Sequence, residues 1–299
     1  MTDTGYRAGF AAVIGRPNVG KSTLINALVG SKVSIVTAKP QTTRHRILGI
    51  TSGPDAQIVF VDTPGLHRDA GKAMNRLMNR TAANALTDAD LVLFVLEANR
   101  WTADDDDVLS RLGSAGRPVF AVLNKIDRIE PKDKLLGILS ELSARFEFAE
   151  LVPVSATRGT NLERLQSLIP PYLPVSPPLF PEHMRTDRGP AFRAAEVIRE
   201  QLMLMLHQEL PYGISVQIER YEEAGAGLEI DAVIWVERDS QKGIVVGKGG
   251  QQLKRAGRAA RLQLRDQTGV PVHLALWVRV RENWADNDAD LKALGFDPV

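Results

Sequence analysis

The sequence predicts an α/β domain with a doubly wound, mostly parallel sheet, followed by a smaller α+β domain. Short apolar runs alternate with helical patterns in the first half of the chain, which is typical of a parallel sheet covered by helices on both faces. Six of the 17 prolines lie between Pro170 and Pro181, where they favour an extended, semi-rigid linker. Beyond this segment the order of the expected elements changes, so we expect it to separate two domains.

The composition excludes several classes of protein. The chain has 299 residues, which suits two domains, and its 44% hydrophobic and 24% charged residues exclude disordered and fibrous proteins. Cysteine is absent, which excludes disulfides, iron–sulfur clusters, zinc fingers and thiol catalysis. No apolar run approaches the roughly 20 residues that span a bilayer, and nothing in residues 1–9 marks the chain for export. We therefore expect a cytoplasmic protein.

Strands and helices alternate in the first domain, which we place at residues 1–172. Strands are expected at residues 10–14, 47–51, 58–61, 91–96, 118–123 and 151–154, where apolar runs have the length of buried strands. Helices are expected to follow Gly20, Gly71, Thr102, Pro131 and Thr160. Thr102 suits a helix cap, because residues 104–107 are then four aspartates in the first turn, where the helix dipole favours negative charge.

The second domain, placed at residues 184–299 after a linker at residues 173–183, is expected to be an α+β sandwich with helices on one face. A helix near residues 190–207 precedes strands at 214–222 and 228–237. Two helices interrupted at residues 247–250 and a strand at 270–280 complete the order. We expect Met203, Met205 and Trp277 to lie in the core of this domain.

A phosphate-binding motif occupies residues 15–22 (GRPNVGKS), which fit the pattern G-x-x-x-x-G-K-[ST] between an expected strand and an expected helix. Lys21 is expected to reach the β- and γ-phosphates, and the Ser22 hydroxyl is expected to bind Mg²⁺. The alternative is a glycine-rich turn that binds nothing, and the strand–loop–helix context disfavours it. The expected contacts are Gly15, Arg16, Pro17, Asn18, Val19, Gly20, Lys21, Ser22 and Thr23.

Three later segments indicate which nucleotide binds, and each follows an expected strand. Asp62 can hold Mg²⁺ through water, and the Gly65 N–H can meet the γ-phosphate. Asp127, in the string NKID, can accept two hydrogen bonds from guanine, whereas adenine would leave this carboxylate unpaired. A backbone N–H of residues 155–157 (SAT) can serve guanine O6. These segments add Asp62, Thr63, Pro64, Gly65, Leu66, Asn124, Lys125, Asp127, Ser155 and Ala156 to the expected site.

The strings at residues 15–26 (GRPNVGKSTLIN), 40–46 (PQTTRHR) and 62–67 (DTPGLH) closely resemble those of the Era-like family of bacterial P-loop GTPases, relatives of the translation factors. The resemblance covers nearly the whole chain. It implies that residues 40–46 form the first switch and that Thr43 ligates Mg²⁺ together with Ser22 and Asp62. From the sequence alone, Thr42 is a rival for the role of Thr43.

The resemblance also implies a GTPase whose catalytic groups are Lys21, Thr43, Gly65 and Asn18. Leu66 stands where many small GTPases have a glutamine, and an apolar side chain cannot orient the attacking water. We therefore expect slow hydrolysis that relies on backbone groups and cations. Asn18 resembles the asparagine that holds K⁺ in related GTPases; the alternative is a loop residue suited to its backbone conformation.

The second domain resembles the type II KH fold of the same family, which binds RNA. Residues 247–250 (GKGG) contain a G-x-x-G loop that can press against a sugar-phosphate backbone, and residues 243–265 hold six basic and no acidic residues. The alternatives are a plain turn and a solvated basic helix face. For Trp284, packing and RNA stacking are alternatives. The expected RNA contacts are Gly247, Lys248, Gly249, Gly250, Lys254, Arg258, Arg261 and Arg265, of which the last four share one helix face.

The resemblance implies a Mg²⁺-dependent, K⁺-stimulated GTPase that hydrolyses GTP to GDP and phosphate and binds 16S rRNA near its 3′ end. It implies a role in the assembly and maturation of the small (30S) ribosomal subunit. We expect a monomer in the cytoplasm; members of the family are also associated with the inner membrane, although no basic amphipathic helix at either terminus supports this here. The rivals are a nucleotide-gated RNA-binding module and a GTPase of tRNA modification or large-subunit assembly.

Overall fold

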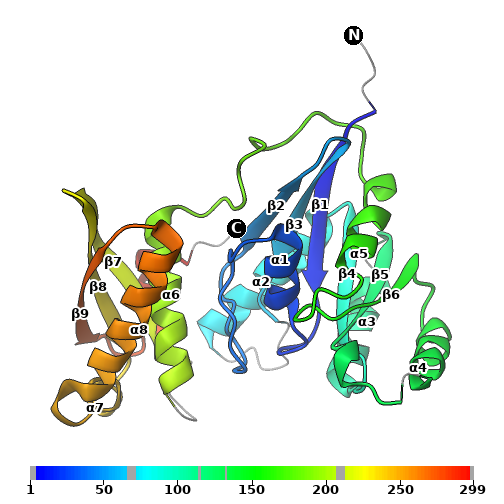
Figure 1. Ribbon diagram of the computed structural model, residues 1–299. Coiled ribbons are helices and arrows are strands. Elements are labelled where there is room, and N and C mark those ends of the chain that lie inside the picture. The colour runs from blue at the N-terminus through cyan, green and yellow to red at the C-terminus, as the bar shows by residue number, and fades with distance from the viewer. Residues whose placement is uncertain (1–4, 66–71, 114–115, 132, 207–212, 297–299) are drawn as a thin grey trace.

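The computed structural model describes residues 5–65, 72–113, 116–131, 133–206 and 213–296. The first part of the chain forms a six-stranded sheet in the order β2-β3-β1-β4-β5-β6 (Figure 1). All neighbouring strands are parallel except β2 and β3, which are antiparallel. The strands are β1 (Arg7–Ile14), β2 (Ile47–Ser52), β3 (Ala56–Asp62), β4 (Leu91–Glu97), β5 (Val119–Asn124) and β6 (Glu150–Pro153).

Helices cover both faces of this sheet, as the sequence predicts. They are α1 (Lys21–Val29), α2 (Ala73–Asp88), α3 (Ala103–Gly113), α4 (Lys134–Ser143) and α5 (Leu162–Leu168). Leu93 of β4 packs in a cluster with residues of α1 and α5, whereas the next residue, Phe94, packs in a cluster with residues of α3 and α4. Because successive strand residues point to opposite faces, a central strand that is buried on both faces must be apolar throughout.

The second part of the chain confirms the expected order of helix, strand, strand, helix, helix and strand. The elements are α6 (Pro190–Met205), β7 (Ser215–Ala224), β8 (Gly227–Val236), α7 (Asp239–Val246), α8 (Gln251–Thr268) and β9 (Val272–Val280). β8 is the central strand, antiparallel to β7 and parallel to β9. Ile230 and Ile234 of β8 pack against Val197 of α6 and Ala260 of α8. A short helix that the sequence does not predict, α9 (Asp288–Ala293), follows the sheet.

The two tryptophans near the C-terminal end of the chain differ in burial. Trp277 is 45% exposed, so its expected core position is wrong. Its neighbours in β9, Leu276 and Val278, pack on the helices, and strand alternation therefore turns Trp277 to the opposite face. Trp284 is fully buried and packs with Met74 and other residues of α2, which favours packing over RNA stacking for this residue.

The proline-rich segment lies against the first sheet rather than apart from it. The Gln57 side chain accepts hydrogen bonds from the N–H groups of Leu179 and Phe180 at 2.8 and 2.9 Å and donates to the Phe180 carbonyl. The Ile50 N–H donates to the Arg185 carbonyl at 2.9 Å. These contacts along β2 and β3 lead the chain into α6, which lies on the side of the second domain that faces the first (Figure 1). No helix in the described part of the chain is long and apolar enough to cross a membrane.

Candidate nucleotide site

The loop between β1 and α1, which we call the P-loop, carries residues 15–20 at the carboxyl end of the sheet. Gly20 directly precedes α1 with φ 101°, a conformation that disfavours any side chain, and a Cβ there would lie 2.4 Å from Asn124 Nδ2. Lys21 begins α1, and its ammonium group donates to the carbonyls of Gly15 and Arg16 at 2.9 and 3.0 Å. Burial lowers the pKa of Lys21 to about 8, with Asp62 raising it and Arg16 lowering it.

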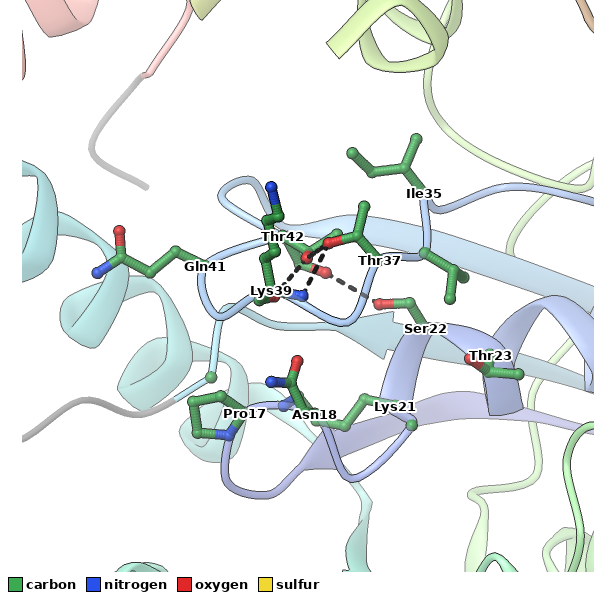
Figure 2. Close-up of a pocket in the computed structure, with 14 residues that line it drawn as sticks. Pro17, Asn18, Lys21, Ser22, Thr23, Ile35, Thr37, Lys39, Gln41 and Thr42 are labelled. Carbon is green, nitrogen blue, oxygen red and sulfur yellow. Dashed lines mark hydrogen bonds between the residues drawn. The ribbon is translucent and has the colours of Figure 1, made fainter. Parts of the chain in front are cut away.

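A pocket lies between the P-loop and the segment of residues 35–43, as Figure 2 shows. Six of the nine residues expected at residues 15–23 line it: Pro17, Asn18, Gly20, Lys21, Ser22 and Thr23. Gly15, Arg16 and Val19 are not in its lining, because Val19 is fully buried and Arg16 extends toward Asp105. Asn18 has φ 66°, so the left-handed conformation that asparagine tolerates is present at this position.

Ser22 and Thr43 line this pocket, and Asp62 lies directly behind them in contact with Thr43. Ser22 Oγ is 2.9 Å from Thr43 Oγ1, and the Thr43 hydroxyl donates to Asp62 Oδ2 at 3.5 Å. Asp62 is fully buried, and its Oδ1 has no hydrogen-bond partner among the described residues. Burial raises the pKa of Asp62, while neighbouring hydroxyl groups and the charge of Lys21 oppose this rise. Two hydroxyls and a carboxylate are the oxygen donors that suit a hard divalent cation such as Mg²⁺.

Thr42 has different partners from Thr43. Its hydroxyl donates to the Lys39 carbonyl at 2.7 Å and lies 2.6 Å from the Thr37 hydroxyl, as the dashed lines in Figure 2 show. The side chain of Thr42 is therefore used within its own loop, whereas Thr43 faces Ser22 and Asp62.

The expected γ-phosphate segment follows β3. Gly65 is buried and lines the pocket, where a Cβ would lie 3.1 Å from Pro17 Cγ. The Thr63 hydroxyl donates to the Val13 carbonyl at 3.0 Å, which fixes this segment to β1, and Pro64 is buried. Leu66 lies outside the described residues.

The expected guanine-binding residues form one hydrogen-bonded group beside the P-loop. Asn124 donates to the Val19 carbonyl at 2.9 Å and accepts from the Ala156 N–H at 3.0 Å. Lys125 donates to the Asn18 carbonyl at 2.8 Å. Asn124 and Lys125 therefore join the P-loop, the NKID segment and the segment of residues 155–157.

Asp127, the residue expected to read the base, accepts a hydrogen bond from the Ser155 hydroxyl at 2.5 Å. This bond lowers the pKa of Asp127, and burial opposes the shift. The carboxylate is therefore charged near neutral pH and is held in one orientation by the third expected segment.

Sequence reasoning missed the residues of the second domain that hold the first switch (residues 40–46) and the loop before it. Glu200 of α6 accepts hydrogen bonds from the Val36 N–H at 2.9 Å and from Lys32 at 2.5 Å. Arg199 donates to the Thr42 carbonyl at 2.5 Å. The helix α6 contains four charged residues, and nothing in their spacing shows that Arg199 and Glu200 are buried, since charged residues are rarely buried unless they are paired. Arg199 and Glu200 are each 3% exposed.

The expected RNA-binding residues lie on the second domain. Gly247 and Gly249 have positive φ values of 70° and 58°, and a Cβ at Gly247 would lie 2.5 Å from Gln252 Cγ. Lys248 and Gly249 are exposed in this loop, and Gly250 is half-buried. A groove between α8 and β9 is lined by three of the four basic helix residues and by His273, which the sequence did not indicate: Leu253, Lys254, Gly257, Arg258, Arg261, His273, Leu274 and Leu276. The fourth, Arg265, is not in this lining and pairs with Asp266 at 2.8 Å.

Two protein families match the chain: one described as 50S ribosome-binding GTPase, over residues 10–125, and the KH domain, over residues 209–285. GTPase Era of Stenotrophomonas maltophilia (strain R551-3) is 52% identical over 294 residues, which are 98% of this chain and 99% of that relative. GTPase Era of Xanthomonas oryzae pv. oryzae (strain MAFF 311018) is 51% identical over 297 residues, which are 99% of each chain.

Two crystal structures resemble the whole chain. A variant of Era from Aquifex aeolicus bound to GDP·AlF4⁻ gives a TM-score of 0.93 at 38% identity and covers 97% of this chain and 99% of its own. Era in complex with MgGDPNP and nucleotides 1506–1542 of 16S ribosomal RNA gives a TM-score of 0.94 at 38% identity, with the same coverage.

Proposed function

The chain belongs to the GTPase Era family and is a GTP hydrolase, and on this premise we propose that it couples GTP hydrolysis to binding of 16S rRNA near its 3′ end. The reaction is GTP + H₂O → GDP + phosphate. The main support for the nucleotide site is the cluster of Ser22, Thr43 and Asp62 beside the buried Lys21. The biological role proposed is assembly and maturation of the 30S subunit, for which the Era complex with 16S rRNA is the support.

In this proposal, different residues bind the phosphates and the guanine base of the nucleotide. Ser22, Thr43 and Asp62 would hold Mg²⁺, which supplies charge neutralisation for the phosphates when bound. Lys21 and the N-terminal end of α1 supply further positive charge for the β- and γ-phosphates. Asp127 accepts from the two guanine donors, and Gly65 offers its N–H near the γ-phosphate.

Guanine specificity through Asp127 tests the nucleotide part of the proposal. Asp127→Asn should weaken GTP binding and improve binding of xanthosine triphosphate, because the amide NH₂ donates to the xanthine carbonyl that replaces the guanine 2-amino group. Calorimetry of the parent and the variant with GTP, xanthosine triphosphate and ATP measures this exchange. Equal affinity of the parent protein for GTP and ATP would refute the assignment.

Stimulation by K⁺ is the second part of the proposal. Asn18 lines the pocket beside Lys21, and its amide oxygen can help to seat a monovalent cation near the β,γ bridge. Hydrolysis should be faster in K⁺ than in Na⁺ at equal ionic strength, and Asn18→Ala should remove most of the difference. Asn18→Gly should remove the difference as well, because it lacks the same oxygen but keeps the left-handed conformation of the loop, and this separates loss of the oxygen from strain in the backbone. Equal rates in the two salts would contradict a K⁺ site.

RNA binding is proposed for the loop of residues 247–250 and the groove between α8 and β9. Replacing Lys248 and Gly249 with aspartates should abolish binding to a single-stranded 3′-terminal 16S fragment, because negative charge then faces the phosphates. GTP binding should be unchanged in this variant. Arg258→Ala should weaken RNA binding less and should reduce its salt dependence. Fluorescence anisotropy over a salt series measures both effects, and parent-like affinity of the double aspartate variant would refute the assignment.

Large-subunit assembly is a second candidate function, favoured by the family description 50S ribosome-binding GTPase. Crosslinking of the protein to cellular RNA in the presence of GTP distinguishes between these two candidate functions. Reads near the 3′ end of 16S rRNA support the small subunit, and reads in 23S rRNA support the large one.

The remaining assignments are predictions from the sequence. We propose a division into a GTPase domain (1–172), a linker (173–183) and a KH domain (184–299), which the two separate sheets support. A cytoplasmic location, with peripheral attachment to the inner membrane as the alternative, and a monomeric state complete the proposal. Fractionation of cells and sedimentation of the purified protein measure these two properties.

A further inference from the structure

Glu97 lies between the two loops that receive opposite ends of the nucleotide. It is the last residue of β4, and β4 lies between β1 and β5 in the sheet. The P-loop follows β1, and the NKID segment begins at the last residue of β5. Glu97 is the register partner of Asn124, the first residue of that segment. The sheet order therefore places one carboxylate between the two loops.

Each oxygen of Glu97 contacts a cation from a different loop. Oε2 accepts from the Arg16 guanidinium of the P-loop at 3.1 Å. Oε1 lies 3.2 Å from Lys125 Nζ of the NKID segment. Burial tends to raise the pKa of Glu97, but Lys125 and Arg16 together lower it, so the side chain is charged at neutral pH.

Both cations are fixed by further contacts, so the bridge connects two ordered loops. The Arg16 Nε donates to the fully buried Asp105 at 3.1 Å. Asp105 in turn accepts from the N–H and hydroxyl of Thr102, each at 2.9 Å. Lys125 also donates to the Asn18 carbonyl at 2.8 Å. A displacement of either loop would therefore lengthen a charge-assisted hydrogen bond to Glu97.

We infer that Glu97 is a positioning residue that sets the spacing between the phosphate-binding loop and the guanine-binding loop. It acts through Arg16 and Lys125, and it need not touch the nucleotide. A nucleotide that spans both loops then binds to a site whose two ends are already correctly spaced, which reduces the ordering cost of binding. The inference rests on the proposed nucleotide site and deepens it.

Glu97→Gln is the sharpest test because it keeps the size of the side chain and removes the bridge. A carboxylate accepts at both oxygens, whereas an amide accepts at one end and presents an NH₂ donor to the other cation. Losing one charge-assisted bond of a side chain that is 14% exposed should accelerate dissociation of fluorescent mant-GDP roughly tenfold. The KM for GTP should rise by a similar factor with kcat nearly unchanged, since bond loss affects ground state and transition state alike.

Glu141→Gln is the matched control, because Glu141 is exposed and lines the same surface cavity as Glu97. Its mant-GDP dissociation rate should equal that of the parent. Glu97→Asp provides a second variant if Glu97→Gln does not fold, since its shorter side chain cannot reach both cations and should also accelerate release. A lower melting temperature with parent-like dissociation and KM in either folded variant would mean a merely structural role and would overturn the inference.

A double-mutant cycle tests whether Glu97 couples Arg16 to Lys125. Arg16→Met and Lys125→Met should have non-additive effects on mant-GDP dissociation in the parent, and additive effects in the Glu97→Gln background. Additive effects in both backgrounds would refute the bridge. The parent's preference for GDP over ADP, measured in the same assay, tests the proposed nucleotide site separately, so failure of the bridge and failure of that site give different results.

Discussion

Replacing Gly49 with alanine tests how closely the edge of the sheet supports the phosphate-binding helix. Gly49 lies in β2, where a Cβ would lie 2.7 Å from Ile25 Cγ2 and 2.9 Å from Val29 Cγ2 of α1. Carbon atoms pack at about 3.5–4.0 Å, so the new methyl group would overlap two side chains. Ile25 is fully buried and Val29 is 7% exposed, and both are β-branched and therefore stiff in a helix. The helix itself must shift.

Two opposing contributions determine how much Gly49→Ala lowers the free energy of unfolding. Overpacking of a core costs about 1–3 kcal/mol, and the loss of glycine freedom in the unfolded chain returns about 0.4–1 kcal/mol. Gly53→Ala is the matched control: its Cβ would meet only the Ala56 carbonyl oxygen at 3.6 Å, so only the stabilising term applies. The free energies of unfolding of the two variants should differ by about 2 kcal/mol, which corresponds to about 4–8 °C in melting temperature.

Thermal unfolding followed by fluorescence measures this difference. The KM for GTP should also rise several-fold in Gly49→Ala alone, because α1 begins with Lys21 and Ser22. A melting temperature of Gly49→Ala at or above that of Gly53→Ala would refute the packing argument.

Three further predictions concern the first switch and the loop that precedes it. Thr43→Ala should reduce Mg²⁺-dependent phosphate release at least about tenfold, and Thr42→Ala should reduce it much less; equal losses would contradict the difference in their partners. Burial lowers the pKa of His45 to about 3, so the unfolded chain binds a proton near pH 6.5, whereas the folded chain does not. The free energy of unfolding should therefore fall as the pH drops from 6.5 toward 3, and His45→Phe should flatten this dependence in urea unfolding. Glu200→Ala should speed trypsin cleavage after Lys32 several-fold, because it removes the hydrogen bonds from Lys32 and from the Val36 N–H that hold the loop before the switch, and an unchanged cleavage rate would count against the role of α6.

The sequence predicts the first sheet well because its central strands are buried on both faces. A strand such as β4 consists, up to its last residue, of consecutive apolar residues, and such a run can be recognised without tertiary information. Each nucleotide motif follows such a strand directly, so parallel pairing alone brings Lys21, Asp62 and Asn124 to one edge of the sheet. This part of the candidate site could be predicted because it is local in sequence and repeated from strand to strand.

The contacts that support these motifs could not be predicted in the same way. Glu97 is a single acidic residue without a local pattern, and Asp105 is one of four consecutive aspartates near the start of α3. Only the order of the strands and the position of α3 show that both face Arg16. The exposure of Trp277 depends on which face of a three-stranded sheet the helices cover. The composition of the linker suggested an extended spacer, whereas its contact with Gln57 depends on one side chain in a distant strand.

The position of Thr43 depends on the second domain as well as on its own motif. Its neighbours on both sides are bound by residues of that domain: the Thr42 carbonyl accepts from Arg199, and the Arg44 guanidinium donates to the Ile214 carbonyl at 2.6 Å. Arg44 is 3% exposed, so this bond is shielded from water and is stronger than a surface contact. Any displacement of the second domain must therefore break these bonds or move the backbone on both sides of Thr43, and with it the distance from Thr43 to Ser22 and Asp62.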